Sequence, residues 1–432
     1  MSSLFTRRIF LTRGLTVLSA ASTLPAFLQR TVYAINNPAD APLTQTAAGK
    51  RDEILVVLQL SGGNDGLSMV IHFDNDDYRR ARAETAHIKD VAELGKGTGI
   101  CLHPNLTAFK ELYDSGELAL IQGVGYPNPN RSHFRAMEIW QTAEPVKPPV
   151  DGWLGRYFDA QCKGADPIDP KAAINIGNIA PLALQGSKFS AVSFQRPDAY
   201  QWFAGNRMVD PKMKRTFQDI NDLTGKTAET TITPSGNPTL DFLERTALDA
   251  QLSSDEIRNV TTRYKGGITY PNNPLAQALQ MVAQMIAGGL YTRVYYVSLV
   301  GFDTHSNQRQ THDRLMLTLS ESVSAFMKDL KAQGNAQRTV LMTFSEFGRR
   351  VTENASHGTD HGAAAPMFVC GAAVKGGVYG NHPSLRPNDL DHGDLKYNTD
   401  FRSVYATMLD KWLHADAQKI LGANFKTLPL LA

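Results

Sequence analysis

The chain is poor in cysteine, which argues against several ways of building a scaffold or a site. Its 432 residues include three cysteines, Cys101, Cys162 and Cys370, and no two of them form a Cys-x-x-Cys pair. Neither a disulfide framework nor a cysteine-ligated zinc site is therefore expected. We interpret the three as small buried apolar residues, with one disulfide left open for an exported chain.

The chain also lacks a strong charge of either sign. Its net charge is +2 at pH 7, but residues 1–34 contain four arginines and no acidic residue, so the rest of the chain carries −2. A nearly neutral body without blocks of lysine and arginine offers no electrostatic footprint for a nucleic acid. We therefore expect no nucleic acid among its partners.

The N-terminal segment has a twin-arginine pattern rather than a membrane span. Thr6-Arg-Arg-Ile-Phe-Leu11 precedes an apolar run, Gly14 to Leu28, that is too short and too polar for a transmembrane anchor. Val32-Tyr-Ala34 is a fair match to a small-x-small cleavage site. We predict a twin-arginine signal peptide over residues 1–34 and a linker over 35–50. The twin-arginine translocase is then a partner, the location is the periplasm or the medium, and the mature form has no membrane anchor.

The rest of the chain alternates apolar runs with amphipathic segments, which is typical of an α/β fold. Apolar runs that predict buried strands lie at 53–60, 118–124, 295–300, 338–344 and 366–371. Segments that predict helices lie at 103–113, from 132 onward, from 151, and at 273–287, 312–331 and 399–413. We predict a doubly wound, largely parallel sheet sandwiched by helices. It forms a single domain over residues 51–432, with an irregular excursion near 165–265.

Several acids and histidines occupy the same kind of position in this pattern. Each lies just past a predicted strand or in a loop that follows one: Asp65, Asp303, His305, Glu346, Asp360 and His361. Ser132 begins a helix that follows a strand. Because the carboxyl ends of parallel strands share one edge, where open α/β sheets bind ligands, we expect these residues to meet there.

This set of side chains suits a divalent cation beside a nucleophile. Carboxylates and imidazoles together bind hard or borderline ions such as Zn²⁺, Mn²⁺ or Mg²⁺, and we expect one or two ions. The metal ligands predicted are Asp65, Asp303, His305, Glu346 and His361. A hydroxyl such as that of Ser132, at a helix N-terminus next to metal ions, is the layout of phosphoryl or sulfuryl transfer.

Some of these residues also have a purely structural interpretation. Asp65 lies in Asn-Asp-Gly, a common turn, Ser132 is a favoured helix N-cap, and Asp303 could cap a turn or a helix. Histidines outside any such motif are expected to be surface or packing residues: His72, His87, His103 and His414. The sequence leaves these alternatives open.

Six motifs resemble, in order, those of the bacterial exported family called domain of unknown function 1501. They are Thr-Arg-Arg-Ile-Phe-Leu at 6–11, Leu-Ser-Gly-Gly-Asn-Asp-Gly-Leu at 60–67, Pro-Asn-Arg-Ser-His-Phe at 129–134, Gly-Phe-Asp-Thr-His at 301–305, Thr-Phe-Ser-Glu-Phe-Gly-Arg at 343–349 and Gly-Thr-Asp-His-Gly at 358–362. The family is grouped with the alkaline phosphatase and sulfatase superfamily. The resemblance therefore implies an alkaline-phosphatase-like α/β sandwich with a two-metal site.

Carried over by position, the resemblance implies a role for each candidate. Asp65 looks like the ligand after the first strand, and Ser132 falls where the superfamily has its nucleophile. The residues that resemble the ligands of one metal are Asp303, His305 and His361. Glu346 falls where an Asp-His pair binds the other metal, but Phe347 follows it here.

Two functions from different classes follow. The first is a metal-dependent hydrolase acting on a phosphate or sulfate ester, of a small molecule or a polymer, with Ser132 attacking. The second is a non-catalytic periplasmic binding or assembly protein that keeps the fold and one metal. The departure at Phe347 favours the second, because it removes a ligand of the second metal.

Overall fold

The structure is a computed structural model that describes residues 53–87, 89–147, 151–162, 169–196, 203–204, 207–208 and 256–431. The predicted signal peptide and linker lie outside these residues, as does most of the predicted excursion near 165–265. Within the described part of the chain, no helix combines the length and apolarity needed to cross a membrane.

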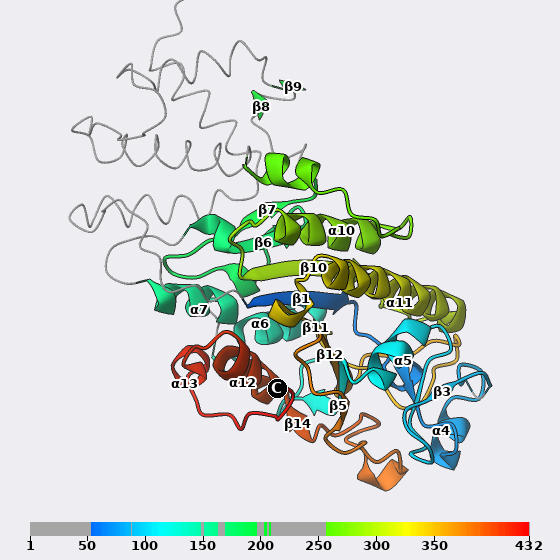
Figure 1. Ribbon diagram of the computed structural model, residues 1–432. Helices are drawn as coiled ribbons and strands as arrows, with labels where there is room; N and C mark the ends of the chain where they lie inside the picture. Colours follow the sequence, from blue (N-terminus) through cyan, green and yellow to red (C-terminus); the bar gives the residue numbers. More distant parts are fainter. Residues whose placement is uncertain are drawn as a thin grey trace, which may run out of the picture.

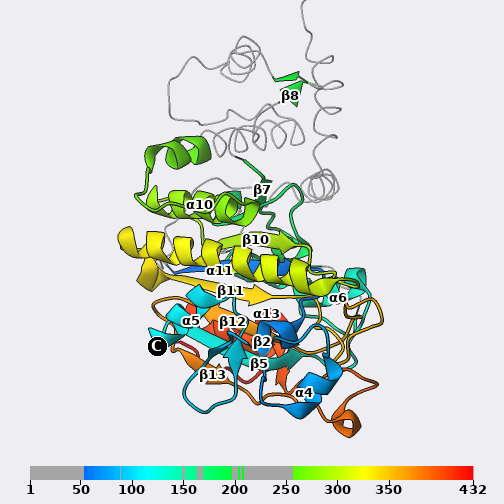
Figure 2. The ribbon, with the colours of Figure 1, turned by 90° about the vertical axis from the view of Figure 1, so that its right-hand side faces the viewer.

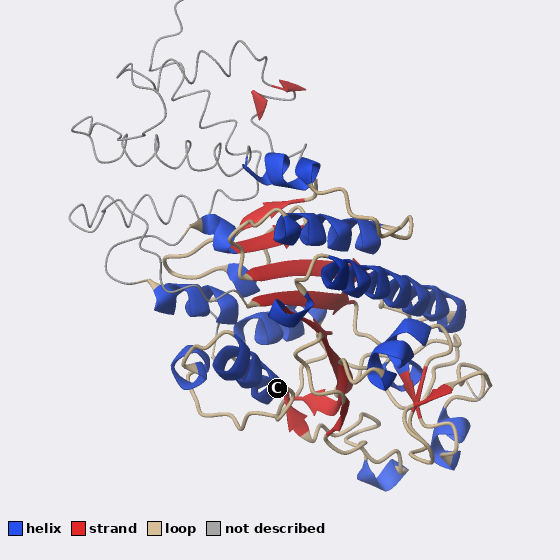
Figure 3. Ribbon diagram, in the orientation of Figure 1, coloured by secondary structure: helices blue, strands red, loops and turns tan. Residues whose placement is uncertain are grey.

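A nine-stranded sheet lies at the centre of the molecule (Figures 1 and 3). Eight strands follow the order β13-β5-β12-β11-β1-β10-β6-β7, and β14 also pairs with β5. Their bounds are β1 Ile54–Ser61, β5 Leu118–Gly125, β6 Ala173–Ile176, β7 Val192–Phe194, β10 Val294–Val300, β11 Thr339–Phe344, β12 Ala365–Cys370, β13 Gly377–Tyr379 and β14 Thr399–Asp400. All the pairings are parallel except those of β12, which is antiparallel to β11 and to β5. The predicted largely parallel sheet is confirmed.

Helices cover both faces of this sheet. On one face lie α5 Thr107–Asp114, α10 Pro274–Ala287 and α11 Gln308–Ala332, of which α10 and α11 pack side by side (Figure 2). On the other lie α6 His133–Thr142, α7 Trp153–Gln161, α12 Phe401–Thr407, the π-helical turn η6 Met408–Trp412 and α13 Ala417–Leu421. The predicted sandwich of a sheet between helices is confirmed.

The central strand β1 shows why the apolar runs are continuous rather than alternating. From Ile54 to Leu60 every side chain of β1 is buried. Leu55 and Val57 face a core with Trp140 and Tyr405, whereas Val56 and Leu58 face the opposite core under α10 and α11. A strand covered on both faces has no solvent side, so it needs apolar residues at successive positions.

Smaller elements complete the described chain. A three-stranded sheet with the order β2-β4-β3 and two short helices follow β1: α3 Gly66–Met69, β2 Val70–Ile71, α4 Asp76–Ala81, β3 Ala92–Glu93 and β4 Cys101–Leu102. A two-stranded pair is formed by β8 Phe203–Ala204 and β9 Arg207–Met208. Short 3₁₀ turns are η2 Pro170–Ala172, η3 Leu182–Leu184, η4 Ala336–Arg338 and η5 Pro387–Asp389.

Two helices start four residues away from the expected positions. The helix expected from residue 103 begins at Thr107, because the N–H of Leu106 instead donates to the carbonyl of His103 in a turn. The helix expected from residue 312 begins one turn earlier, at Gln308. Its first turn carries Gln, Arg, Gln and Thr, so no apolar periodicity marks it.

The strand directions bring several loops to one edge of the sheet. β1, β5, β10 and β11 all run the same way, so the segments that follow them leave from a common edge. The antiparallel β12 instead brings its amino end to that edge. Residues 354–362, which precede β12, therefore join the loops that follow the parallel strands.

Candidate metal centre

Three histidines at this edge point the same ring nitrogen towards one carboxylate. The Nδ1 atom of His361 lies 2.8 Å from the backbone carbonyl oxygen of Arg131. A carbonyl oxygen only accepts hydrogen bonds, so Nδ1 carries the proton and Nε2 keeps its lone pair. This Nε2 lies 3.2 Å from Oδ1 of Asp303.

His305 repeats the arrangement from the loop after β10. Its Nδ1 lies 3.3 Å from Oδ1 of Asp360, and its Nε2 lies 3.1 Å from Oδ1 of Asp303. The Nε2 atoms of His305 and His361 are 2.9 Å apart. Three acceptor atoms thus form a nearly equilateral triangle, which requires a proton or a cation between them.

His133, the first residue of α6, supplies a third imidazole. Its Nδ1 lies 3.0 Å from Oε1 of Glu346, and its Nε2 lies 3.5 Å from Oδ2 of Asp303. Ligand atoms of His133, Asp303 and His361 all lie within 4.8 Å of one another. Our sequence interpretation did not single out this histidine, although it directly follows Ser132 in the motif at 129–134.

The donor set fits a divalent cation of the zinc type. Tetrahedral ligands about 2.0 Å from zinc are about 3.3 Å apart, close to the 2.9 to 3.2 Å sides of the triangle. Each ring also donates its Nδ1 proton to an oxygen, the outer contact that fixes the tautomer of metal-ligating histidines. Three carboxylates lie at or behind these rings, those of Asp303, Glu346 and Asp360.

Arg349 holds the loops of this edge together. Its side chain is fully buried and donates to the carbonyl oxygens of Gly62, Gly63 (2.7 Å), Phe302 (3.0 Å) and Thr359 (2.8 Å). It also donates to Oδ1 of Asp303 at 2.7 Å. Partial burial opposes ionisation, but the hydrogen bond and the positive charge of Arg349 lower the pKa of Asp303 to about 2. Asp303 is therefore a carboxylate at neutral pH.

Two glycines let these loops approach one another closely. Gly62 has φ of 121°, and a Cβ atom there would lie 2.5 Å from the backbone nitrogen of Asp303. Gly63 has φ of 76°, and its Cβ would lie 2.1 Å from the Phe347 ring. No other residue type fits both the backbone conformation and the space.

Asp65 and Glu346, both predicted as metal ligands, make other contacts in the structure. Asp65 is fully buried and forms a two-pronged ion pair with Arg82, at 2.5 and 3.0 Å, besides accepting from Ser68 and Gln308. Burial would raise the pKa of Asp65, but Arg82 holds it far below its usual value. Glu346 accepts from the N–H of Gly62 at 2.8 Å and pairs with His133. The structure therefore brings Asp303, His305 and His361 together and places Glu346 behind His133.

Ser132 lies between two residues that contact the centre. It is the N-cap residue of α6, but its side chain makes no capping hydrogen bond. The preceding Arg131 accepts from His361 through its carbonyl, and the following His133 faces Asp303. The exposed hydroxyl of Ser132 is thus not used as a cap, and in the chain this residue lies between two that contact the imidazole cluster.

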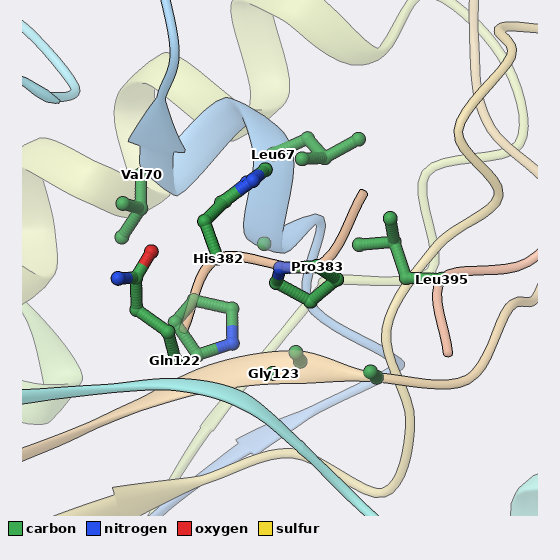
Figure 4. A pocket seen from close by; sticks show the side chains of 11 residues that line it. Leu67, Val70, Gln122, Gly123, His382, Pro383 and Leu395 are labelled. Atoms are coloured by element: carbon green, nitrogen blue, oxygen red, sulfur yellow. The ribbon is translucent and has the colours of Figure 1, made fainter. Parts of the chain in front are cut away.

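A separate small cavity lies behind the loop that follows β1 (Figure 4). It has about 290 Å³ of empty space, part of it open to solvent, and is lined by residues including Leu67, Gln122 and His382. The side chains around Asp303 do not line it. Gln122 Oε1 has no hydrogen-bond partner, and the His382 ring packs on that of His72 at a tilt of 45°, with ring centroids 3.3 Å apart.

The fold and this edge together define an α/β sandwich protein with a candidate metal centre at the carboxyl ends of its strands. The chain belongs to the family described as "Protein of unknown function (DUF1501)", whose profile matches residues 205–423, about half of the chain. The matched region includes Asp303, His305, Glu346 and His361 and begins after Ser132. A search of curated proteins found no match.

Solved structures with a similar fold include three bacterial proteins. One is described as a protein in the alkaline phosphatase superfamily from Vibrio parahaemolyticus, with a TM-score of 0.34, 9% identity and coverage of 92% of this chain and 76% of that one. A second is the PsFucS1 sulfatase from Pseudoalteromonas sp., with a TM-score of 0.36, 11% identity and coverage of 94% of this chain and 76% of that one. A third is alkaline phosphatase from the Antarctic bacterium TAB5, with a TM-score of 0.32, 13% identity and coverage of 76% of this chain and 95% of that one. At these TM-scores the likenesses carry no inference about the function of this chain.

Proposed function

We propose that the protein is an exported, metal-dependent hydrolase of phosphate or sulfate esters. The observation that carries this proposal is the convergence of three imidazole Nε2 atoms on the carboxylate of Asp303. Within the described residues, each of these rings has an oxygen acceptor at its Nδ1. An arrangement of acceptors facing acceptors is suited to a bound cation and unfavourable without one.

His133, Asp303, His305 and His361 would hold the ion. Outside them, Glu346, Asp360 and the Arg131 carbonyl fix the three rings, and Arg349 fixes Asp303. A divalent cation there would supply Lewis-acid stabilisation of the charge that develops on the ester oxygens. We place Asp65 and Glu346 outside the ligand set, because Arg82 occupies one carboxylate and Gly62 and His133 occupy the other. The site then holds one ion rather than two.

Ser132 is the nucleophile in this proposal. Its Oγ would attack the phosphorus or sulfur atom, form a covalent ester with the enzyme and release the alcohol of the substrate. Water would then cleave that ester and regenerate the hydroxyl. The first turn of α6 directs unpaired backbone N–H groups to the same place, which favours an anionic group there.

A non-catalytic binding or assembly role is the second candidate, and the surroundings of Phe347 favour it. The Phe347 ring packs 4.6 Å from the His361 ring and 4.9 Å from the His133 ring, measured between centroids. An apolar ring thus occupies the position after Glu346 where a second-metal ligand is expected. A protein of this kind would bind one ion and turn over no ester.

Aryl phosphates and aryl sulfates test the catalytic proposal. We expect the metal-loaded protein to hydrolyse at least one of them, and Ser132→Ala and His305→Ala to lose that activity. Ser306→Ala, an exposed neighbour of His305, is the control and should retain it. Activity that survives in both Ser132→Ala and His305→Ala would show that the site is wrong. Metal binding without hydrolysis of any ester would support the binding protein instead.

We also propose that the protein reaches the periplasm or the medium through the twin-arginine translocase. Replacing Arg7 and Arg8 with lysine should leave the protein in the cytoplasm, because the pair is the central feature of the signal. Cell fractionation and immunoblotting measure the distribution. Unchanged export of the double variant would refute this route.

A further inference from the structure

A second group of histidines and an acid lies outside the candidate metal centre. Nε2 of His103 is 2.9 Å from Oδ1 of Asp313, and Nε2 of His87 is 3.0 Å from the same oxygen. The two Nε2 atoms are 3.1 Å apart. These three atoms form a triangle of nearly the same size as the one at Asp303.

The members of this triangle come from three separate parts of the chain. His87 lies between α4 and β3, His103 follows β4, and Asp313 lies on α11. His103 is 1% exposed and His87 is 6% exposed, whereas about a third of the Asp313 side chain is accessible. Solvent therefore reaches the triangle from the side of Asp313, and the imidazoles are held within the protein.

The chemistry of the donors indicates which ion they suit. Two imidazole nitrogens and one carboxylate oxygen are ligands of borderline ions, and zinc commonly takes three such protein ligands together with a water molecule. Mg²⁺ and Ca²⁺ prefer oxygen ligands, so a site with two nitrogens selects against them. The spacings of 2.9 to 3.1 Å are close to the separation of about 3.3 Å between zinc ligands.

One contact has to change when a cation binds. The backbone N–H of Asn105 donates to Nδ1 of His103 at 3.0 Å, so in the present arrangement the proton of that ring is on Nε2. Binding through Nε2 moves the ring proton to Nδ1 and breaks the hydrogen bond from Asn105.

A neighbouring buried histidine has an unused acceptor. His312 is 1% exposed, its Nε2 donates to Oδ1 of Asn64, and its Nδ1 has no partner. Its ring centroid is 5.8 Å from that of His103.

We propose that His87, His103 and Asp313 bind a second divalent cation, Zn²⁺, that fastens α11 to the segment between α4 and α5. This proposal rests on a different donor set from the proposed hydrolase centre. The ion would cross-link residues that are more than 200 positions apart, and its role is to stabilise the fold.

The test uses a background in which the first centre is disabled. The double variant His305→Ala, His361→Ala removes two ligands that are partly exposed, so it is expected to fold. Titration of this variant with Zn²⁺ alone, after chelation and dialysis, should give one equivalent of bound zinc. Adding Asp313→Asn, or separately His87→Gln, should raise the dissociation constant for that zinc ion by at least about 100-fold. The loss of even an outer hydrogen-bond partner of a ligand lowers metal affinity by about 10- to 100-fold.

Asp76→Asn in the same background is the control, since Asp76 is exposed and forms only a surface ion pair with Arg79. Circular dichroism checks that each variant is folded. A background variant that binds no zinc would overturn the proposal. So would folded Asp313→Asn and His87→Gln variants that both bind zinc as tightly as the background.

Discussion

Replacing Arg349 with methionine removes the guanidinium that several loops contact at the sheet edge with the candidate metal centre. The methionine keeps most of the apolar volume of the side chain but donates no hydrogen bond. Four carbonyl oxygens, those of Gly62, Gly63, Phe302 and Thr359, then lose a donor, and Asp303 loses its guanidinium partner. These groups come from three loops that are far apart in sequence.

The magnitude follows from the number of acceptors and from their burial. The carbonyl of Phe302 keeps the N–H of Thr304 as a donor, so three of the four carbonyls are left without one. A buried acceptor left without a donor costs at least about 1 kcal/mol, so these three together amount to about 3 kcal/mol. The ion pair with Asp303 adds little, because nearly half of that side chain is exposed to solvent. Over the predicted domain of residues 51–432, an unfolding entropy of roughly 2 cal/mol/K per residue converts this loss into a fall of about 4 °C in the thermal midpoint.

Arg350→Met is the matched control, because it changes the adjacent arginine in the same way. Arg350 donates to the carbonyl of His392 at 2.7 Å and lies 3.5 Å from Asp394, with its side chain 38% exposed. Asp394 is buried but keeps Arg131 as an ion-pair partner, so the loss of the partly exposed Arg350 contacts should cost up to about 1 kcal/mol and lower the midpoint by about 1 °C. Calorimetry of the two metal-free variants measures both shifts. Equal midpoints for Arg349→Met and Arg350→Met would show that the buried hydrogen bonds of Arg349 do not stabilise the fold.

Three other predictions follow from buried groups. Burial lowers the pKa of His72 to about 4 and of His382 to about 3, whereas both have a pKa of about 6.5 in the unfolded chain. Below about pH 6.5 the unfolded chain therefore binds protons that the folded protein does not. The free energy of unfolding should fall by roughly 2 kcal/mol for each histidine between neutral pH and pH 5. His382→Gln should reduce this fall in denaturant titrations at pH 7.5 and pH 5, and an equally steep fall would count against it. Asp65→Asn leaves Arg82 buried without its partner and should cost about 3–5 kcal/mol, whereas the exposed Asp76→Asn should change the free energy of unfolding by less than about 0.5 kcal/mol. Gly62→Ala should weaken zinc binding at the Asp303 centre, because its Cβ would push against the backbone of Asp303, and an unchanged dissociation constant would contradict this.

Much of the fold was predictable from the sequence, because a buried segment needs apolar residues and this need is visible within a few positions. Strands such as β1 and β11 are covered on both faces, so their apolar runs stand out from their surroundings. The direction of β12 was not predictable in this way, since an apolar run carries no sign of whether it pairs parallel or antiparallel. That direction matters, because it brings the loop with His361 to the metal edge from the amino end of its strand.

The candidate site was predicted in part, and the missing part depends on distant partners. Asp303, His305 and His361 were found because each lies in a motif close to a strand end. The ion pair of Asp65 was not foreseeable, because Arg82 lies in an irregular segment 17 positions away. His133 and the group of His87, His103 and Asp313 share this difficulty, since only the tertiary structure brings their ring nitrogens to a common point.

The central claim is that the four residues around Asp303 bind a divalent cation. An anomalous-scattering map of crystals of the protein purified from its native compartment tests it most directly. We expect a peak at the absorption edge of the bound metal, within bonding distance of Nε2 of His305 and His361 and of the Asp303 carboxylate, and we expect Asp303→Asn to lose it. A map with no peak at this position, from protein never exposed to a chelator, would contradict the account.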